Sequence, residues 1–238
     1  MGFFKTWSDM SVIGIDDEAA IESFLYSSDA SLKALECGEE SELQAAYSVL
    51  NNTSIDKFFA VIEKERDEQP LTPADVPCFS NLENGIIRLN ELLEFEPNGL
   101  SFVDAGFQLM NSVKPGARTK YGENHSKLAA IMSLVTITNT RPALVKPTSW
   151  GTFLTRYDIS AKRGVLQKLA LRDACVRAVV SSAFKGTTCY REIVSILSAS
   201  TALRRRSNVK CLVEFVLEGT EREDALSRID WEVVYKKD

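Results

Sequence analysis

The stretch "STALRRRSNVKCLVEFV" (residues 200–216) places three consecutive arginines directly before an apolar stripe. Apolar residues that recur every three or four positions predict an amphipathic helix with one buried face. Serine is a preferred residue at helix N-termini, so we expect Ser200 to cap this helix. The residues predicted to be buried are Val209, Leu212, Val213 and Val216.

The N-terminal end of this predicted helix is basic. The partial positive charge of a helix N-terminus disfavours arginine by a few tenths of a kcal/mol, so an anionic ligand would explain the position. A short turn separates the helix from the helical pattern "CYREIVSILS" (189–198). This order is typical of a helix-turn-helix, whose second helix contacts DNA with its N-terminal residues. The candidate DNA-binding residues are Thr201, Arg204, Arg205, Arg206 and Asn208, of which all but Arg206 are expected to be exposed.

Two other interpretations of these arginines stay open. They could form an ordinary solvated basic face, or they could pair with acidic residues of the N-terminal half. The acidic residues needed for such pairing are concentrated in the N-terminal half of the chain. The net charge of the chain is −5, but residues 1–100 carry six basic and 20 acidic side chains, and residues 101–238 carry 22 and 13. This split predicts two parts with different partners.

The acidic part has helical spacing, and we expect a helical domain over residues 1–98. Its predicted role has three alternatives. It recruits a protein partner, it joins two copies of the chain in a homodimer, or it masks the basic surface by imitating phosphate charge. The proline-rich segment "QPLTPADVPCFSN" (69–81) is interpreted as a connection.

A first basic unit is predicted over residues 99–158. A helix over "LSFVDAGFQLM" (100–110) would bury Val103, Phe107 and Met110, with Ser101 as its cap. The helix that follows, "TKYGENHSKLAAIMSLV" (119–135), presents a polar face. Two short β-rich runs then flank "NTRP", which predicts a β-hairpin, and Thr148 caps the next helix. The additional candidate DNA-binding residues are Lys120, Asn124 and Lys127 on the polar face and Arg141 at the hairpin tip.

A second basic unit is predicted over residues 159–238. It contains the helices described above and ends in "IDWEVVY" (229–235), whose alternation predicts a strand. The residues on one face of that strand would be Ile229, Trp231, Val233 and Tyr235.

The sequence excludes several classes of site. Its five cysteines form no CxxC pair and its one histidine is His125, so a zinc site is not expected. Nucleotide-binding glycine motifs and clustered catalytic residues are not found, so we predict no cofactor and no enzymatic activity. No long apolar run indicates a membrane span or a secretory signal, which predicts a cytoplasmic protein.

The stretch 200–216 resembles the pattern "s-T-x-x-R-R-x-x-T-V-x-x-W" of winged-helix modules associated with bacterial restriction and anti-phage systems. Thr201, Arg204, Arg205, Asn208 and Val209 occupy corresponding places. The segment "YGENHSKLAAIMSLV…PTSWGTFL" is similar to the first unit of the same tandem arrangement. Thr148 and Gly151 match its Thr-x-x-Gly helix start, and Ser133 replaces the usual glycine.

The predicted fold class is mainly α with small β-hairpins (α+β), as an acidic helical domain followed by two winged-helix units. The resemblance implies binding of double-stranded DNA, as a regulator or DNA-recognition subunit of a restriction or anti-phage defence system. The alternative is a non-enzymatic adaptor or effector subunit that uses its winged helices for protein docking, because fold alone does not determine function.

Overall fold

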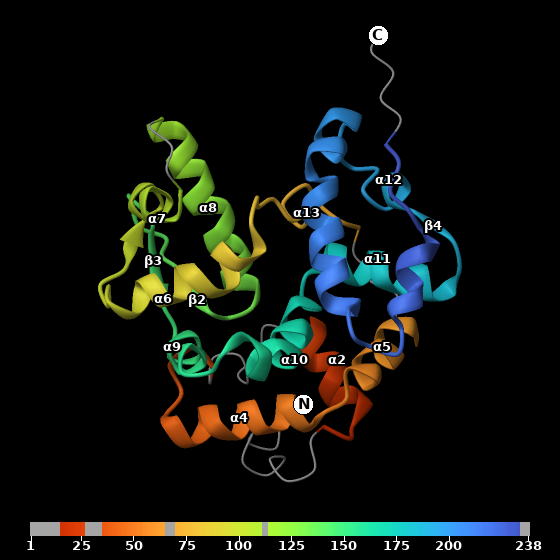
Figure 1. The fold of residues 1–238 in the computed structure, drawn as a ribbon, viewed down its shortest axis with the longest axis horizontal. Coiled ribbons are helices and arrows are strands. Elements are labelled where there is room, and N and C mark those ends of the chain that lie inside the picture. Colours follow the sequence, from red (N-terminus) through yellow and green to blue (C-terminus); the bar gives the residue numbers. More distant parts are fainter. Residues whose placement is uncertain (1–14, 27–34, 65–69, 111–113, 234–238) are drawn as a thin grey trace.

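The computed structural model describes residues 15–26, 35–64, 70–110 and 114–233 (Figure 1). These residues form a mainly helical protein with two small β-sheets, which confirms the predicted α-rich class. Buried apolar side chains from all parts of the described chain belong to one hydrophobic core.

The helices α2, α4 and α5 of the acidic N-terminal region lie along one side of the molecule, at the bottom of Figure 1. Phe24 of α2 and Phe58 and Phe59 of α5 are completely buried in the core. The helix α5 packs against α11, and α4 packs against α9 and α10, so these helices lie against the basic part. The predicted boundary at residue 98 stays a prediction, although packing contacts cross it. The helices are α2 (Glu18–Tyr26), α4 (Glu40–Asn52) and α5 (Ile55–Lys64).

The next region is built around the long helix α8 (Pro115–Ile131). Its three strands form an antiparallel sheet in the order β1-β3-β2, in which Thr136 lies opposite Lys146. The strands β2 and β3 are the predicted hairpin, which is therefore confirmed. The other elements of this region are η1 (Asn84–Arg88), α6 (Leu89–Glu94), β1 (Leu100–Ser101), α7 (Phe102–Leu109), β2 (Val135–Ile137), β3 (Leu144–Pro147) and α9 (Ser149–Thr155).

Two glycines allow α7 and α8 to pack with their backbones in close contact. A Cβ atom added to Gly106 would lie 1.9 Å from the carbonyl oxygen of Arg118, and one added to Gly122 would lie 2.0 Å from that of Phe102. This contact turns the small residues of α7 inward. The predicted burial of Val103 and Phe107 is therefore wrong, because both side chains are exposed. Ser101 caps α7 as predicted, through the backbone N–H of Asp104.

Thr148 and Gly151 join the end of the hairpin to α9. The Thr148 hydroxyl accepts a hydrogen bond from the backbone N–H of Gly151 at 2.8 Å and donates to the carbonyl oxygen of Ser133 at 2.7 Å. A Cβ atom on Gly151 would lie 2.1 Å from the carbonyl oxygen of Leu134, so this position requires glycine. The Thr-x-x-Gly pattern thus has a physical reason in this chain, and the predicted cap is confirmed.

The last region is built around α13 (Ala199–Leu217). The predicted stripe of Val209, Leu212, Val213 and Val216 is completely buried, which confirms the helix and its inner face. Ser198, not Ser200, is the N-cap, because its hydroxyl accepts from the backbone N–H of Thr201. The other elements are α10 (Ile159–Ala170), α11 (Ala174–Lys185), β4 (Thr188–Cys189), α12 (Tyr190–Ile193), η2 (Glu223–Arg228) and β5 (Ile229–Asp230).

The predicted terminal strand is shorter than the alternation suggested. The strand β5 covers two residues and pairs in parallel with β4, with Ile229 opposite Thr188. Ile229 and Val233 are buried, and Trp231 packs against the core. Tyr235 lies outside the described residues.

Candidate functional site

The helices α8 and α13 stand on opposite sides of the upper half of the molecule, and a segment from the acidic region passes between them (Figure 1). Side chains from both helices line a hollow of about 540 Å³, which we call the central cleft. Its lining comprises Cys78, Phe79, Ser80, Met110, Ala117, Lys120, Tyr121, Asn124, His125, Arg204, Ser207, Asn208 and Cys211.

The three consecutive arginines point in three directions, because successive residues of an α-helix are rotated by about 100°. Arg204 lines the central cleft. Arg205 points toward residues 73–76, and Arg206 donates a hydrogen bond to the carbonyl oxygen of Trp231 at 3.4 Å. The three arginines, although consecutive in the sequence, therefore lie in three different environments and do not form one basic patch.

Arg204 is exposed, and Thr201 holds its guanidinium. One guanidinium nitrogen, Nη2, donates to the Thr201 hydroxyl at 3.1 Å, and the other guanidinium nitrogens have no hydrogen-bond partner among the described residues. An arginine with several donors left over is suited to binding phosphate or carboxylate groups. Thr201, predicted as a DNA-binding residue, thus also positions Arg204.

Arg205 ties α13 to the acidic region. Its Nη1 atom donates to the carbonyl oxygens of Pro73 at 2.5 Å and Val76 at 2.8 Å. Arg205 is half-buried rather than fully exposed. These acceptors are backbone carbonyls of the acidic region. Arg205 therefore contacts this region through hydrogen bonds and not through the ion pairs with acidic side chains that the sequence suggested.

The polar face of α8 supplies the opposite wall. Lys120 and Lys127 both bind Glu123, at 2.9 and 2.6 Å, and these hydrogen bonds lower the pKa of the Glu123 carboxyl. Asn124 donates to the sulfur of Cys78 at 3.5 Å. Lys120 and Asn124 line the central cleft, whereas Lys127 does not. Both lysine side chains remain largely exposed, so surface ion pairs of this kind hold them only weakly.

A smaller side pocket of about 110 Å³ adjoins the central cleft and shares Lys120 and Asn124 with it. Lys127 and Arg205 line this side pocket together with Asp173. Burial raises the pKa of the Asp173 carboxyl to about 7, so its negative charge is only partly present at neutral pH.

His125 is a neutral packing residue in the wall of the cleft. Its Nε2 atom accepts from the backbone N–H of Asn81 at 3.3 Å, Nδ1 contacts the carbonyl oxygen of Tyr121 at 2.7 Å, and its ring stacks on that of Tyr121. Burial lowers the pKa of the imidazole, which keeps it uncharged at neutral pH. Among the described residues, the lining of the central cleft carries two positive side chains, Lys120 and Arg204, and no carboxylate, although Lys120 pairs with Glu123 beside the cleft.

Asn208 was expected to be exposed, and this expectation is wrong. The residue is 8% exposed, yet it lines the central cleft, and no described residue forms a hydrogen bond with its carboxamide. Its polar atoms are not among the fully buried ones that lack a hydrogen-bond partner, so they reach the open space of the cleft. This side chain therefore faces the cleft with its hydrogen-bonding capacity unused.

The structure brings some of the predicted site residues together and separates others. Lys120, Asn124, Arg204 and Asn208, from two segments at least 80 positions apart in the sequence, meet in one cleft. Arg141 is exposed in the turn between β2 and β3 and belongs to neither the cleft nor the side pocket. Arg206 is on the face of α13 that meets the end of β5.

The sequence interpretation missed the contribution of residues 70–81. This segment was interpreted as a connection within the acidic domain, but Cys78, Phe79 and Ser80 line the cleft, and its carbonyl oxygens bind Arg205. Its backbone also meets α8 through Asn81 and His125. The three prolines in the segment are the one signal that could have suggested an ordered path, because proline restricts the backbone.

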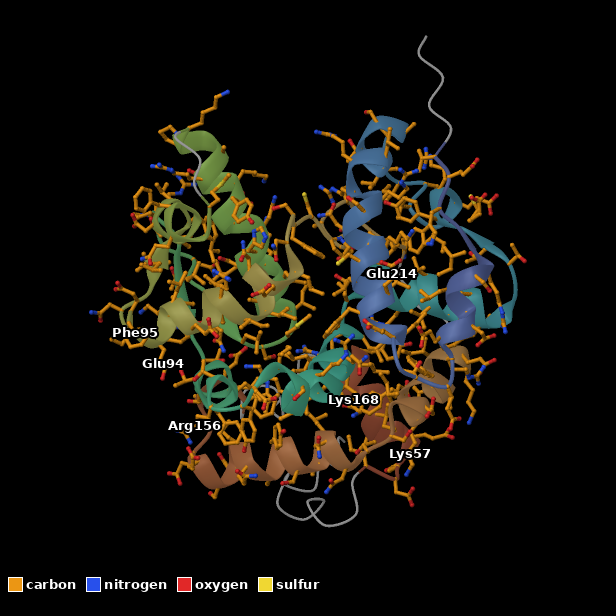
Figure 2. The ribbon with its side chains drawn as sticks, viewed as in Figure 1. Lys57, Glu94, Phe95, Arg156, Lys168 and Glu214 are labelled. Atoms are coloured by element: carbon orange, nitrogen blue, oxygen red, sulfur yellow. The ribbon has the colours of Figure 1, made fainter. Side chains whose placement is uncertain are left out.

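The acidic region forms ion pairs with the basic part away from the cleft. Glu40 pairs with Arg156, which Figure 2 shows beside α4, and Glu63 pairs with Arg222. Across residues 15–26, 35–64 and 70–100, no carboxylate forms an ion pair with Lys120, Arg204 or Arg205. The predicted imitation of phosphate charge is not present among these contacts.

In the part of the chain that the structure describes, no cluster of histidine, cysteine and acidic side chains is suited to a metal ion. None of the described helices has both the length and the apolar character that crossing a membrane requires. No protein-family model, no curated protein and no solved structure matches this chain.

Proposed function

We propose that this chain is a DNA-binding protein that holds phosphate groups with the facing sides of α8 and α13. The observation that carries the proposal is the central cleft, where Lys120 and Arg204 supply positive charge and the described lining residues include no carboxylate. Positive side chains that contact phosphates provide most of the affinity of non-specific DNA binding. Asn124 and Ser207 add polar groups of the kinds that bind phosphate oxygens and base edges.

The order of elements supports two winged-helix units. The first region runs helix, β1, α7, α8, β2, β3, with the sheet order β1-β3-β2, which fits a helix-turn-helix followed by a hairpin wing. The second region repeats the beginning of this order in α11, β4, α12 and α13, and then departs from it. The proposal therefore takes the first unit as complete and the second as a shortened version.

Ser133 also supports the resemblance to winged-helix modules. The backbone φ of Ser133 is +57°, in the left-handed region that favours glycine, and glycine is usual at this place in the modules. Arg172 donates to the Ser133 hydroxyl at 2.9 Å, which gives serine a specific partner here. On this resemblance we propose a role as regulator or DNA-recognition subunit in a bacterial restriction or anti-phage system.

A protein adaptor is the second candidate function, and exposed apolar side chains favour it. Phe107 is 58% exposed on α7, and Phe95 is 82% exposed after α6 and points away from the molecule in Figure 2. Large exposed aromatics are enriched at protein interfaces. The two candidates predict different sensitivities, because docking through this face would depend on Phe107 and not on Arg204.

The test is fluorescence anisotropy with a labelled DNA duplex that carries a single-stranded end. We expect the full chain to bind at low salt and Arg204→Ala to weaken binding several-fold. Lys210→Ala is the matched control, because Lys210 is an exposed cation of the same helix outside the cleft lining. Equal affinities for both variants and the unmodified chain, or no binding by any of them, would reject the proposal.

A further inference from the structure

We infer that the central cleft receives one nucleotide, with its base inside the cleft and its phosphate at Lys120 and Arg204. This inference rests on the proposed DNA binding and names the part of the ligand that the cleft takes. The nucleotide is either an unpaired unit of a DNA strand or a free mononucleotide, since both present the same chemical groups. It follows from the shape of the cleft, from the unused carboxamide of Asn208 and from the distribution of charge.

The shape of the site favours a small ligand over a duplex. A recognition helix normally enters the major groove, which is about 12 Å wide and surrounds the helix. Here the cleft-lining sides of α8 and α13 face one another, so they cannot both enter the groove of one duplex. A volume of about 540 Å³ lies within the range of pockets that bind small ligands.

Asn208 indicates the chemistry of that ligand. The residue is 8% exposed and lines the cleft, and its carboxamide has no hydrogen-bond partner among the described residues. Asn124, on the opposite wall, uses its amide nitrogen only in a long contact with Cys78. Two carboxamides can offer both donors and acceptors to one planar group. This combination matches the edge of a nucleobase, which asparagine side chains bind in DNA complexes.

The remaining lining residues fit the other parts of a nucleotide. Tyr121 and Phe79 add aromatic surface near the two carboxamides, and bases bind to proteins partly through aromatic contact. Arg204 and Lys120 have their charged groups exposed. A base held inside would therefore leave its phosphate close to two cations at the opening.

The experiment compares three probes with the full chain. The probes are a single strand of about 12 nucleotides, the perfect duplex of the same sequence and each of the four deoxynucleoside monophosphates as competitor. We expect the single strand to bind about tenfold more tightly than the duplex. Competition by a monophosphate at millimolar concentration would show that the cleft also takes the free nucleotide, and its absence would limit the site to a strand.

The decisive variant is Asn208→Leu, which replaces the unused carboxamide with an apolar group of similar size. We expect its affinity for the single strand to fall about tenfold, while its melting temperature stays equal or rises. Asn51→Leu, at the exposed end of α4, is the control and should change neither value. If Asn208→Leu does not fold, Asn124→Leu tests the opposite wall with the same expected loss.

The outcomes separate this inference from the proposed function. Equal binding of single strand and duplex, with no effect of Asn208→Leu or Asn124→Leu, would overturn the nucleotide site and leave DNA binding intact. A lower melting temperature of Asn208→Leu with unchanged affinity would assign Asn208 a packing role and also overturn the inference. Absence of binding to every probe would overturn both proposals.

Discussion

The regions around α8 and α13 follow a similar chain order but are stabilised in different ways. The α8 region closes with a three-stranded antiparallel sheet, and its helices α7 and α8 touch through Gly106 and Gly122. The α13 region ends in a two-residue parallel pairing of β4 with β5, and a buried apolar stripe packs α13 against the core. A shared order of elements therefore does not require the same sheet or the same kind of helix contact.

Buried charge is the second difference between the two regions. The described part of the α8 region, residues 82–110 and 114–155, buries neutral polar residues such as Asn90 and His125, and no charged side chain. Residues 159–185 bury four charged groups, which are Lys162, Lys168, Asp173 and Arg177. We infer that the stability of the α13 region depends more strongly on pH than that of the α8 region.

The largest expected effect on stability comes from replacing glycine by alanine, and it should differ between two positions. Gly122→Ala should lower the free energy of unfolding by about 3 kcal/mol or more, because the new Cβ atom would collide with the carbonyl oxygen of Phe102. Gly164→Ala, inside α10, should instead raise it by up to about 1 kcal/mol, because the atom nearest to its Cβ, Nζ of Lys168, would lie at an ordinary contact distance of 3.8 Å. Urea denaturation of both variants measures these values, and similar changes in the two would refute the assigned backbone contact.

Lys168→Met should have the next largest effect, in the opposite direction. Lys168 is 4% exposed and has no ion pair among the described residues, and burial lowers the pKa of its amine to about 8. Between pH 8 and the usual lysine value of 10.5, the unfolded chain binds more protons than the folded chain. The free energy of unfolding therefore rises with pH in this interval, and burial of the charge costs the most below it.

At pH 7, Lys168→Met should accordingly be more stable than the unmodified chain by on the order of 2 kcal/mol. This advantage should shrink as the pH rises from 8 to 10.5. Thermal unfolding of both proteins at several pH values checks the prediction. Lys57→Met, at a largely exposed lysine paired with Asp16, is the control. A constant difference across the interval would show that Lys168 does not titrate there.

Arg205→Ala should have the smallest of these effects on stability. The variant loses two hydrogen bonds, to the backbone carbonyls of Pro73 and Val76, and Val76 is buried. We expect a loss of about 1–2 kcal/mol. Hydrogen exchange should become faster in residues 70–81 and stay unchanged in β2 and β3. Uniform exchange across both regions would show that Arg205 does not hold this segment specifically.

Local signals in the sequence were sufficient for much of the fold. The hairpin of β2 and β3, the caps at Ser101 and Thr148 and the buried stripe of α13 follow from spacing and residue type. The inner face of α7 did not, because the apolar pattern suggested Val103 and Phe107. The close approach at Gly106 and Gly122 is a contact between two helices, which periodicity within one helix does not report.

The candidate site was predictable in residue type but not in arrangement. Lys120, Asn124 and Arg204 were identified from their positions on polar helix faces, and the structure places them in one cleft. That α8 and α13 face each other across residues 70–81 depends on packing between distant segments. The burial of Asn208 has the same origin, since the helical pattern placed it on the exposed face.

The measurement that tests the central claim most directly is the salt dependence of DNA binding. The unmodified chain, Lys120→Ala, Arg204→Ala and the double variant are compared by anisotropy at increasing salt concentration. If both helices hold phosphates of one ligand, each single variant reduces the slope of log affinity against log salt by about 1, and the double variant by about 2. Lys210→Ala should keep the original slope. Unchanged slopes in the double variant would contradict a shared phosphate-binding cleft.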